Sequence, residues 1–87
     1  MAGIFEILLE ILEDLSPEEL ERFKLHLTKP VLDGFTPIPK GKLGTNVTQL
    51  VQIMERSYRD QGSIDITLKI LEKMNLRDLE DKLKQKR

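Results

Sequence analysis

The chain has 87 residues, a formal net charge of −1 and a hydrophobic share of 39%. A chain of this length forms one small domain, and it has no cysteine, which excludes disulfides and thiolate metal sites. No apolar run approaches the roughly 20 residues that span a bilayer. The apolar run 4–12 is interrupted by Glu6 and Glu10 and lacks a basic leader, so we do not expect a signal peptide.

The first helix is predicted over residues 3–15, because their apolar side chains fall on one broad arc of a helical wheel. The opposite side carries only acids, namely Glu6, Glu10, Glu13 and Asp14. Glu13 and Asp14 stand near the helix end, where the helix dipole disfavours negative charge. The stripe is either a solvated face or a surface kept acidic for a basic partner, and both interpretations stay open.

The charges are distributed unevenly along the chain. Residues 1–29 hold seven acids and three bases, a sum of −4, whereas residues 30–87 hold eight acids and eleven bases, a sum of +3. A small domain with surfaces of opposite charge is suited to head-to-tail association with copies of itself.

The second helix is predicted over residues 17–29, and its start has the clearest signal in the chain. Ser16 is a preferred N-cap, Pro17 suits the first helical position, and Glu19 completes a capping box with Ser16. Pro30 ends the helix, because the residue before a proline is pushed out of the α region.

Leu25 departs from the apolar face of this helix. Phe23 and Leu27 lie on the inner face, while Leu25 points nearly opposite to it, between Arg22 and Lys29. One exposed leucine is ordinary on a protein surface. A leucine framed by cations is nevertheless a first indication of a contact surface.

Residues 30–45 hold three prolines and three glycines, so they are predicted to be a loop with at most one helical turn at about 40–43. Loops of this length in compact domains are usually functional or mobile. This one is too apolar for a free linker, and we expect it to be pinned against the rest of the domain.

Three further helices are predicted, at about 46–60, 63–74 and 76–84. The helix 63–74 is apolar around more than half of its circumference, which favours a central position in the bundle. No strand signal occurs anywhere, so the predicted fold class is all-α.

The ends of these helices have local signals. Gln61 and Gly62 are expected to end the helix 46–60, and Ser63 is expected to cap the next one. Asn75 is expected to take the left-handed position after residue 74.

Catalysis has little support in the sequence. His26 is the only histidine, its neighbours are leucines, and no nucleophile, phosphate-binding or zinc motif accompanies it. The bases form no single stripe and the aromatics are few, which argues against nucleic-acid binding. We therefore expect no enzyme, no cofactor and no metal, and neither nucleic acid nor membrane as a partner.

Three blocks of the sequence resemble the pyrin domain of the death-fold superfamily. They are Leu8-x3-Leu12-Glu13-x-Leu15-Ser16-x-Glu18-Glu19-Leu20-x2-Phe23-Lys24-x2-Leu27, Ile38-Pro39-Lys40-Gly41, and Leu68-x2-Leu71-x2-Met74-Asn75-Leu76-x2-Leu79. The resemblance covers the whole chain and is strongest over residues 8–27. It implies an antiparallel Greek-key bundle of five to six helices, with a short or irregular third helix inside the long loop.

The resemblance also implies homotypic assembly. Pyrin domains occur at the N-terminus of inflammasome sensors and in their adaptor, and they pair acidic helices one and four with basic helices two and three of the next copy. The matched positions and their neighbours give the expected partner-binding residues Glu6, Glu10, Glu13, Asp14, Arg22, Leu25, Lys40 and Lys42. Two features differ from the family pattern. Glu21 and His26 stand where lysine is frequent, and no acid lies between Asp33 and Glu55, so helix four lacks its acidic start.

We therefore expect residues 1–87 to form a cytoplasmic pyrin-type module that recruits a pyrin-containing adaptor, as the N-terminal domain of a larger sensor. A stand-alone decoy that blocks such assemblies is the first alternative, and the length of the native gene product separates the two. The second alternative is an unrelated helical regulator that binds an amphipathic peptide in a groove. Such a regulator would be a stable monomer, and its binding would be indifferent to charge reversal.

Overall fold

The computed structural model describes residues 3–30, 34–44 and 46–86. Its elements are α1 (Ile4–Glu13), α2 (Pro17–Leu27), the 3-10 turn η1 (Lys40–Lys42), α3 (Val47–Lys73) and α4 (Arg77–Lys86). Within the described ranges every regular element is helical, so the predicted all-α bundle with an irregular third helix is confirmed. The helix count is lower than expected, because the segments 46–60 and 63–74 are joined across a kink at Arg59 into the single element α3.

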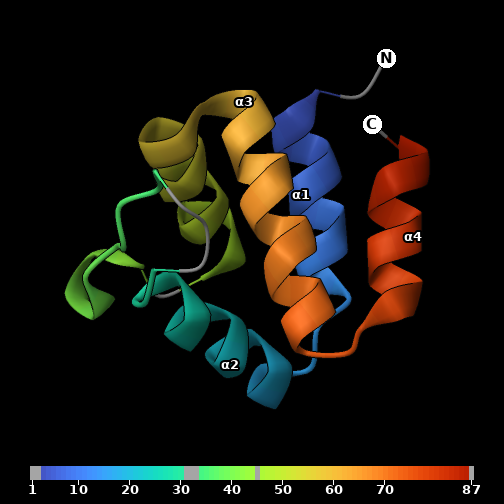
Figure 1. The fold of residues 1–87 in the computed structure, drawn as a ribbon, viewed down its shortest axis with the longest axis horizontal. Coiled ribbons are helices and arrows are strands. Elements are labelled where there is room, and N and C mark those ends of the chain that lie inside the picture. The colour runs from blue at the N-terminus through green and yellow to red at the C-terminus, as the bar shows by residue number, and fades with distance from the viewer. Residues whose placement is uncertain (1–2, 31–33, 45, 87) are drawn as a thin grey trace.

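The long element α3 organises the bundle. It contacts α1, α2 and α4, and α4 also lies against α1 (Figure 1). Ile66, Ile70 and Leu71, from its C-terminal stretch, are each at most 1% exposed. The central position predicted for this stretch is therefore confirmed. No helix in the described part of the chain is long and apolar enough to cross a membrane.

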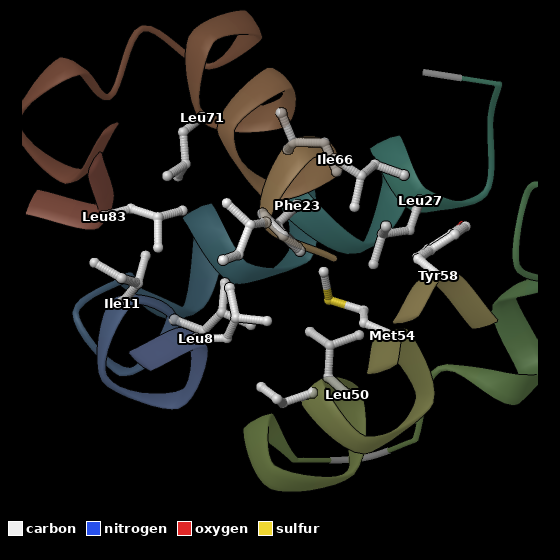
Figure 2. Packing of buried hydrophobic residues seen from close by; sticks show 14 of the residues in the cluster. Leu8, Ile11, Phe23, Leu27, Leu50, Met54, Tyr58, Ile66, Leu71 and Leu83 are labelled. Atoms are coloured by element: carbon white, nitrogen blue, oxygen red, sulfur yellow. The ribbon is translucent and has the colours of Figure 1, made fainter. Parts of the chain in front are cut away.

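The hydrophobic core draws on all four α-helices and on the loop between α2 and α3. Figure 2 shows Phe23 of α2 near the middle, with Leu8 of α1 and Met54 of α3 around it. The loop contributes Ile38 and Leu43, which are 5% and 1% exposed. Because these two residues are buried in the same cluster as the helices, the loop is part of the folded domain.

The turn between α1 and α2 has the capping box expected from the sequence. The Glu19 backbone N–H donates to Ser16 Oγ at 3.2 Å, and the Ser16 backbone N–H donates to Glu19 Oε1 at 2.8 Å. Pro17 occupies the first turn of α2. Since both hydrogen bonds join residues three apart, the sequence motif alone specifies where α2 begins.

The predicted break between the segments 46–60 and 63–74 is present as a kink inside α3, but its position and its signals differ from the prediction. Arg59 has φ 64° and ψ −175°, and the helical stretches before and after it run in different directions (Figure 1). Gln61, Gly62 and Ser63 all lie within the helical element, so the predicted helix end at residues 61–62 and the predicted cap at Ser63 are wrong. Ser63 is instead fully buried, and its hydroxyl donates to the Met54 carbonyl at 3.0 Å.

Gly62 has a packing role in place of a helix-ending one. A Cβ atom at this position would lie 3.2 Å from Tyr58 Cβ and 3.4 Å from Phe35 Cζ. The distance to Tyr58 is tighter than most real Cβ contacts, whereas the distance to Phe35 is that of an ordinary van der Waals contact. The absent side chain therefore leaves room chiefly for Tyr58 within α3.

The loop before η1 is pinned to the bundle at several points, as predicted. The Ile38 backbone N–H donates to the Leu27 carbonyl at 2.9 Å, which ties the loop to the end of α2. The Tyr58 hydroxyl donates to the Thr36 carbonyl at 2.8 Å, and the Phe35 and Tyr58 rings stack with centroids 5.2 Å apart. These contacts fix the base from which η1 projects.

The end of α3 follows the prediction for Asn75. Asn75 has φ 60°, and its backbone N–H donates to the Glu72 carbonyl at 3.1 Å. The Leu76 backbone N–H donates to the Leu71 carbonyl at 2.9 Å. This pair of hydrogen bonds is a Schellman motif, which turns the chain sharply from α3 into α4.

Candidate functional site

Four acidic side chains project from α1 and its C-cap, and we call them the acidic face. They are Glu6, Glu10, Glu13 and Asp14, and all four are exposed. The opposite side of α1 is formed by buried aliphatic residues between Ile7 and Leu12. The amphipathic pattern predicted for the first helix is therefore confirmed.

Part of the acidic face is covered by cations of α4. Lys82 Nζ lies 2.6 Å from Asp14 Oδ2 and 3.5 Å from Glu10 Oε1. Lys86 Nζ lies 3.1 Å from Glu10 Oε2. A hydrogen bond from Lys86 lowers the pKa of Glu10, and a hydrogen bond to Asp14 raises the pKa of Lys82.

These contacts divide the acidic face into two pairs. Glu10 and Asp14, the paired acids, have partners within the same chain. Glu6 and Glu13, the open acids, have no ion pair or hydrogen-bonding partner among the residues that the structure describes. The helix dipole disfavours the negative charge of Asp14, and Lys82 offsets that charge within the same chain. The position of Asp14 therefore needs no second molecule to explain it.

A hollow of about 330 Å³ lies between α2 and η1, with Leu25 on its border. Leu25 is 50% exposed and is the only large exposed hydrophobic residue in the described ranges, as predicted. Lys40 of η1 lines the same hollow, so the structure brings Leu25 and Lys40 together. An apolar side chain beside a cation can receive a partner that presents an apolar group next to a carboxylate.

The remaining predicted cations, Arg22 and Lys42, do not line this hollow. Arg22 is exposed on α2, one helical turn before Leu25. Lys42 lines a second hollow of about 610 Å³, formed by the loop before η1 and by α3. We call Arg22, Leu25, Lys40 and Lys42 together the basic surface.

Three charged residues next to the basic surface were not among the predicted site residues. Lys24 and Glu21 line the first hollow and lie 3.8 Å apart, from Lys24 Nζ to Glu21 Oε1. Glu21, which the sequence marks as a charge inversion, therefore offsets a neighbouring cation. Arg56 of α3 lines the second hollow beside Lys42. No local sequence pattern indicates that Arg56 and Lys42 line the same hollow, because their proximity depends on how α3 packs against the loop.

α4, which covers part of the acidic face, and η1 of the basic surface lie in different parts of the fold. In Figure 1, α4, which flanks the acidic face, and η1, which carries two lysines of the basic surface, are at opposite ends of the longest axis. One copy can therefore present both surfaces at the same time. Such a separation is the geometry required for head-to-tail assembly.

Comparison with known proteins identifies the family. The family model described as PAAD/DAPIN/Pyrin domain matches residues 7–81. The chain belongs to the pyrin-domain family. The match covers every α-helix at least in part, so the death-fold bundle implied by the three sequence blocks is the fold of this pyrin domain.

Relatives of this pyrin domain include both short and long proteins. It is 36% identical over 73 residues to Pyrin domain-containing protein 1 of Homo sapiens, covering 82% of each chain. It is 38% identical over 81 residues to NACHT, LRR and PYD domains-containing protein 6 of Rattus norvegicus, covering 92% of this chain and 9% of that one. It is 30% identical over 80 residues to Apoptosis-associated speck-like protein containing a CARD of Mus musculus, covering 90% of this chain and 42% of that one.

The family match assigns the general role of the chain. A pyrin domain is an interaction module that associates with its own kind, so the two charged surfaces are candidate contact surfaces. The chain spans less than half the length of two of these relatives and most of the length of the third. The relatives therefore include both a multidomain context and a short one.

Proposed function

We propose that this pyrin domain binds other pyrin domains head-to-tail, with the acidic face of one copy against the basic surface of the next. In this role it recruits a pyrin-containing adaptor in the cytoplasm, as the N-terminal domain of a larger sensor. The observation that carries the proposal is the separation of two oppositely charged exposed surfaces on one small domain. The similarity to a NACHT, LRR and PYD domains-containing protein supports the sensor context.

The contact combines weak charge pairs with one apolar anchor. An exposed ion pair contributes about 1 kcal/mol at most, so a single pair such as Glu13 with Arg22 cannot hold an assembly together. Leu25, half exposed between α2 and η1, supplies apolar area at the centre of the basic surface. Repetition along an array makes the sum of such contacts sufficient.

A second candidate function is that of a stand-alone pyrin domain that occupies an adaptor and blocks further assembly. The observation that favours it is the similarity to Pyrin domain-containing protein 1, of which the chain covers 82%. Both candidates use the same surfaces, so binding experiments do not separate them. The length of the native protein does, when it is measured on an immunoblot with an antibody against this domain.

The experiment measures binding to the pyrin region of the mouse Apoptosis-associated speck-like protein containing a CARD. Glu13→Lys should weaken binding while leaving helicity and thermal unfolding unchanged. Leu25→Ala should also weaken it, with less dependence on salt because the lost contact is apolar. A mixture of Glu13→Lys with Arg22→Glu should regain association across one interface but should not propagate into larger assemblies.

The matched control is Glu72→Lys, which makes the same charge change on an exposed acid of α3 outside both surfaces. This control should bind like the unmodified chain. If Glu13→Lys and Leu25→Ala also bind the adaptor region like the unmodified chain, these surfaces are not the ones used. Indifference to every charge reversal is the behaviour of the helical peptide-binding regulator.

A further inference from the structure

The first and last helices are joined by ion pairs on the surface that the proposed function requires. Lys82 bridges two carboxylates of the acidic face, at 2.6 Å from Asp14 and 3.5 Å from Glu10. Lys86 adds a contact at 3.1 Å to Glu10. The side chains of Lys82 and Lys86 are 36% and 34% exposed, so both remain at the surface where a partner would approach.

The paired acids lie on one edge of the acidic face. At about 100° per residue, Glu13 and Glu6 point within about 20° of each other on a helical wheel. Glu10 and Asp14 are rotated by about 40° and 80° from Glu6, in one direction. That direction is toward α4, because the α4 lysines contact these two acids. A cation of a second molecule meets Glu6 and Glu13 unopposed, but it meets Glu10 and Asp14 only beside an internal lysine.

We propose that Lys82 and Lys86 act as internal competitors of a basic partner. They occupy Glu10 and Asp14 and confine a docking pyrin domain to Glu6 and Glu13. This inference rests on the proposed function, since it states how the acidic face of the same interface is regulated. Release of the two lysines exposes all four carboxylates and strengthens association through this face.

The structure provides a matched control on α4 and α3. Lys84 lies between the two competitors in sequence but borders a different surface, together with Lys69 and Glu72 of α3. Replacing Lys84 and Lys69 by glutamine removes the same total charge as replacing Lys82 and Lys86. A general effect of net charge is therefore separated from removal of the contact with the acidic face.

The test uses two probes, the mouse adaptor pyrin region and an octalysine peptide. Binding is titrated at low ionic strength and again at about 0.5 M salt, where exposed charges are strongly screened. The Lys82→Gln, Lys86→Gln chain should bind both probes about two- to tenfold more tightly than the unmodified chain, and this gain should vanish at high salt. The Lys69→Gln, Lys84→Gln chain should bind like the unmodified chain.

A further substitution tests whether the gain passes through the paired acids. Glu10→Gln in the Lys82→Gln, Lys86→Gln background should remove most of the gain. Circular dichroism of each variant checks that the fold is intact.

The outcomes separate this inference from the proposed function. Absence of any binding to the adaptor region would refute the proposed function. The octalysine titration would then be the test of whether Lys82 and Lys86 compete with a basic partner. An equal gain in the control chain, or no gain in the Lys82→Gln, Lys86→Gln chain, would overturn the inference. A gain with octalysine but none with an adaptor region that binds the unmodified chain would overturn it as well.

Discussion

The contact between Tyr58 and the loop allows one hydrogen bond to be isolated by the substitution Tyr58→Phe. The Tyr58 hydroxyl donates to the Thr36 carbonyl at 2.8 Å, and burial raises the pKa of this hydroxyl, so it stays a neutral donor. Phenylalanine keeps the ring that stacks on Phe35 at 5.2 Å. Only the hydrogen bond is lost, which typically contributes about 0.5–1.5 kcal/mol. Thr36 is exposed, so water can replace the donor, and we expect a loss of about 0.5–1 kcal/mol.

Urea unfolding measures the change in the free energy of unfolding, and native-state amide exchange measures the loop itself. The Ile38 amide, which donates to Leu27, should exchange faster in Tyr58→Phe, because the neighbouring attachment of the loop is weaker. Phe35→Leu is the complementary variant, since it removes the ring stack and keeps the hydroxyl. An unchanged free energy of unfolding together with an unchanged Ile38 exchange rate would show that Tyr58 does not hold the loop.

Two further predictions concern strain and pH. Arg59 has φ 64° and ψ −175°, a region that costs a non-glycine residue about 1–3 kcal/mol, so Arg59→Gly should raise the free energy of unfolding by about 0.5–2 kcal/mol in urea titrations. A loss of stability in Arg59→Gly would contradict the inference that the backbone is strained at this position. Burial, then Lys73 and Lys29, lower the pKa of His26 below its ordinary value of 6.5. The unfolded chain therefore takes up a proton more readily, and stability should fall as the pH drops below about 6.5. His26→Gln should flatten this dependence, and an unaltered pH profile would contradict it.

The features predicted correctly from the sequence are those set by neighbouring residues. Ser16 and Glu19 complete their hydrogen bonds over three residues, and Asn75 forms its left-handed turn with the last turn of α3. Leu25 was placed correctly because helical periodicity alone puts it opposite the core. None of these predictions required knowledge of a distant partner.

The sequence predicts that a break exists in α3, but it does not predict its position at Arg59. Gly62 and Ser63 have the composition of a helix end followed by a cap, yet both serve packing contacts within α3. Gly62 leaves room for Tyr58, and the Ser63 hydroxyl donates back to the Met54 carbonyl. The chain changes direction at Arg59, and arginine is not a residue type that favours a positive φ. Tertiary packing therefore outweighed the local preference at this turn.

The acidic face shows the same limit for charge. The sequence places four carboxylates on one side of α1, but it does not show which of them are balanced within the chain. Lys82 is 68 residues away from Asp14, and only the packing of α4 against α1 brings the two together. Once the paired acids are set aside, Glu6 and Glu13 remain, two helical turns or about 10 Å apart. A complementary partner must therefore present two cations at that spacing, a narrower requirement than a uniformly acidic stripe would impose.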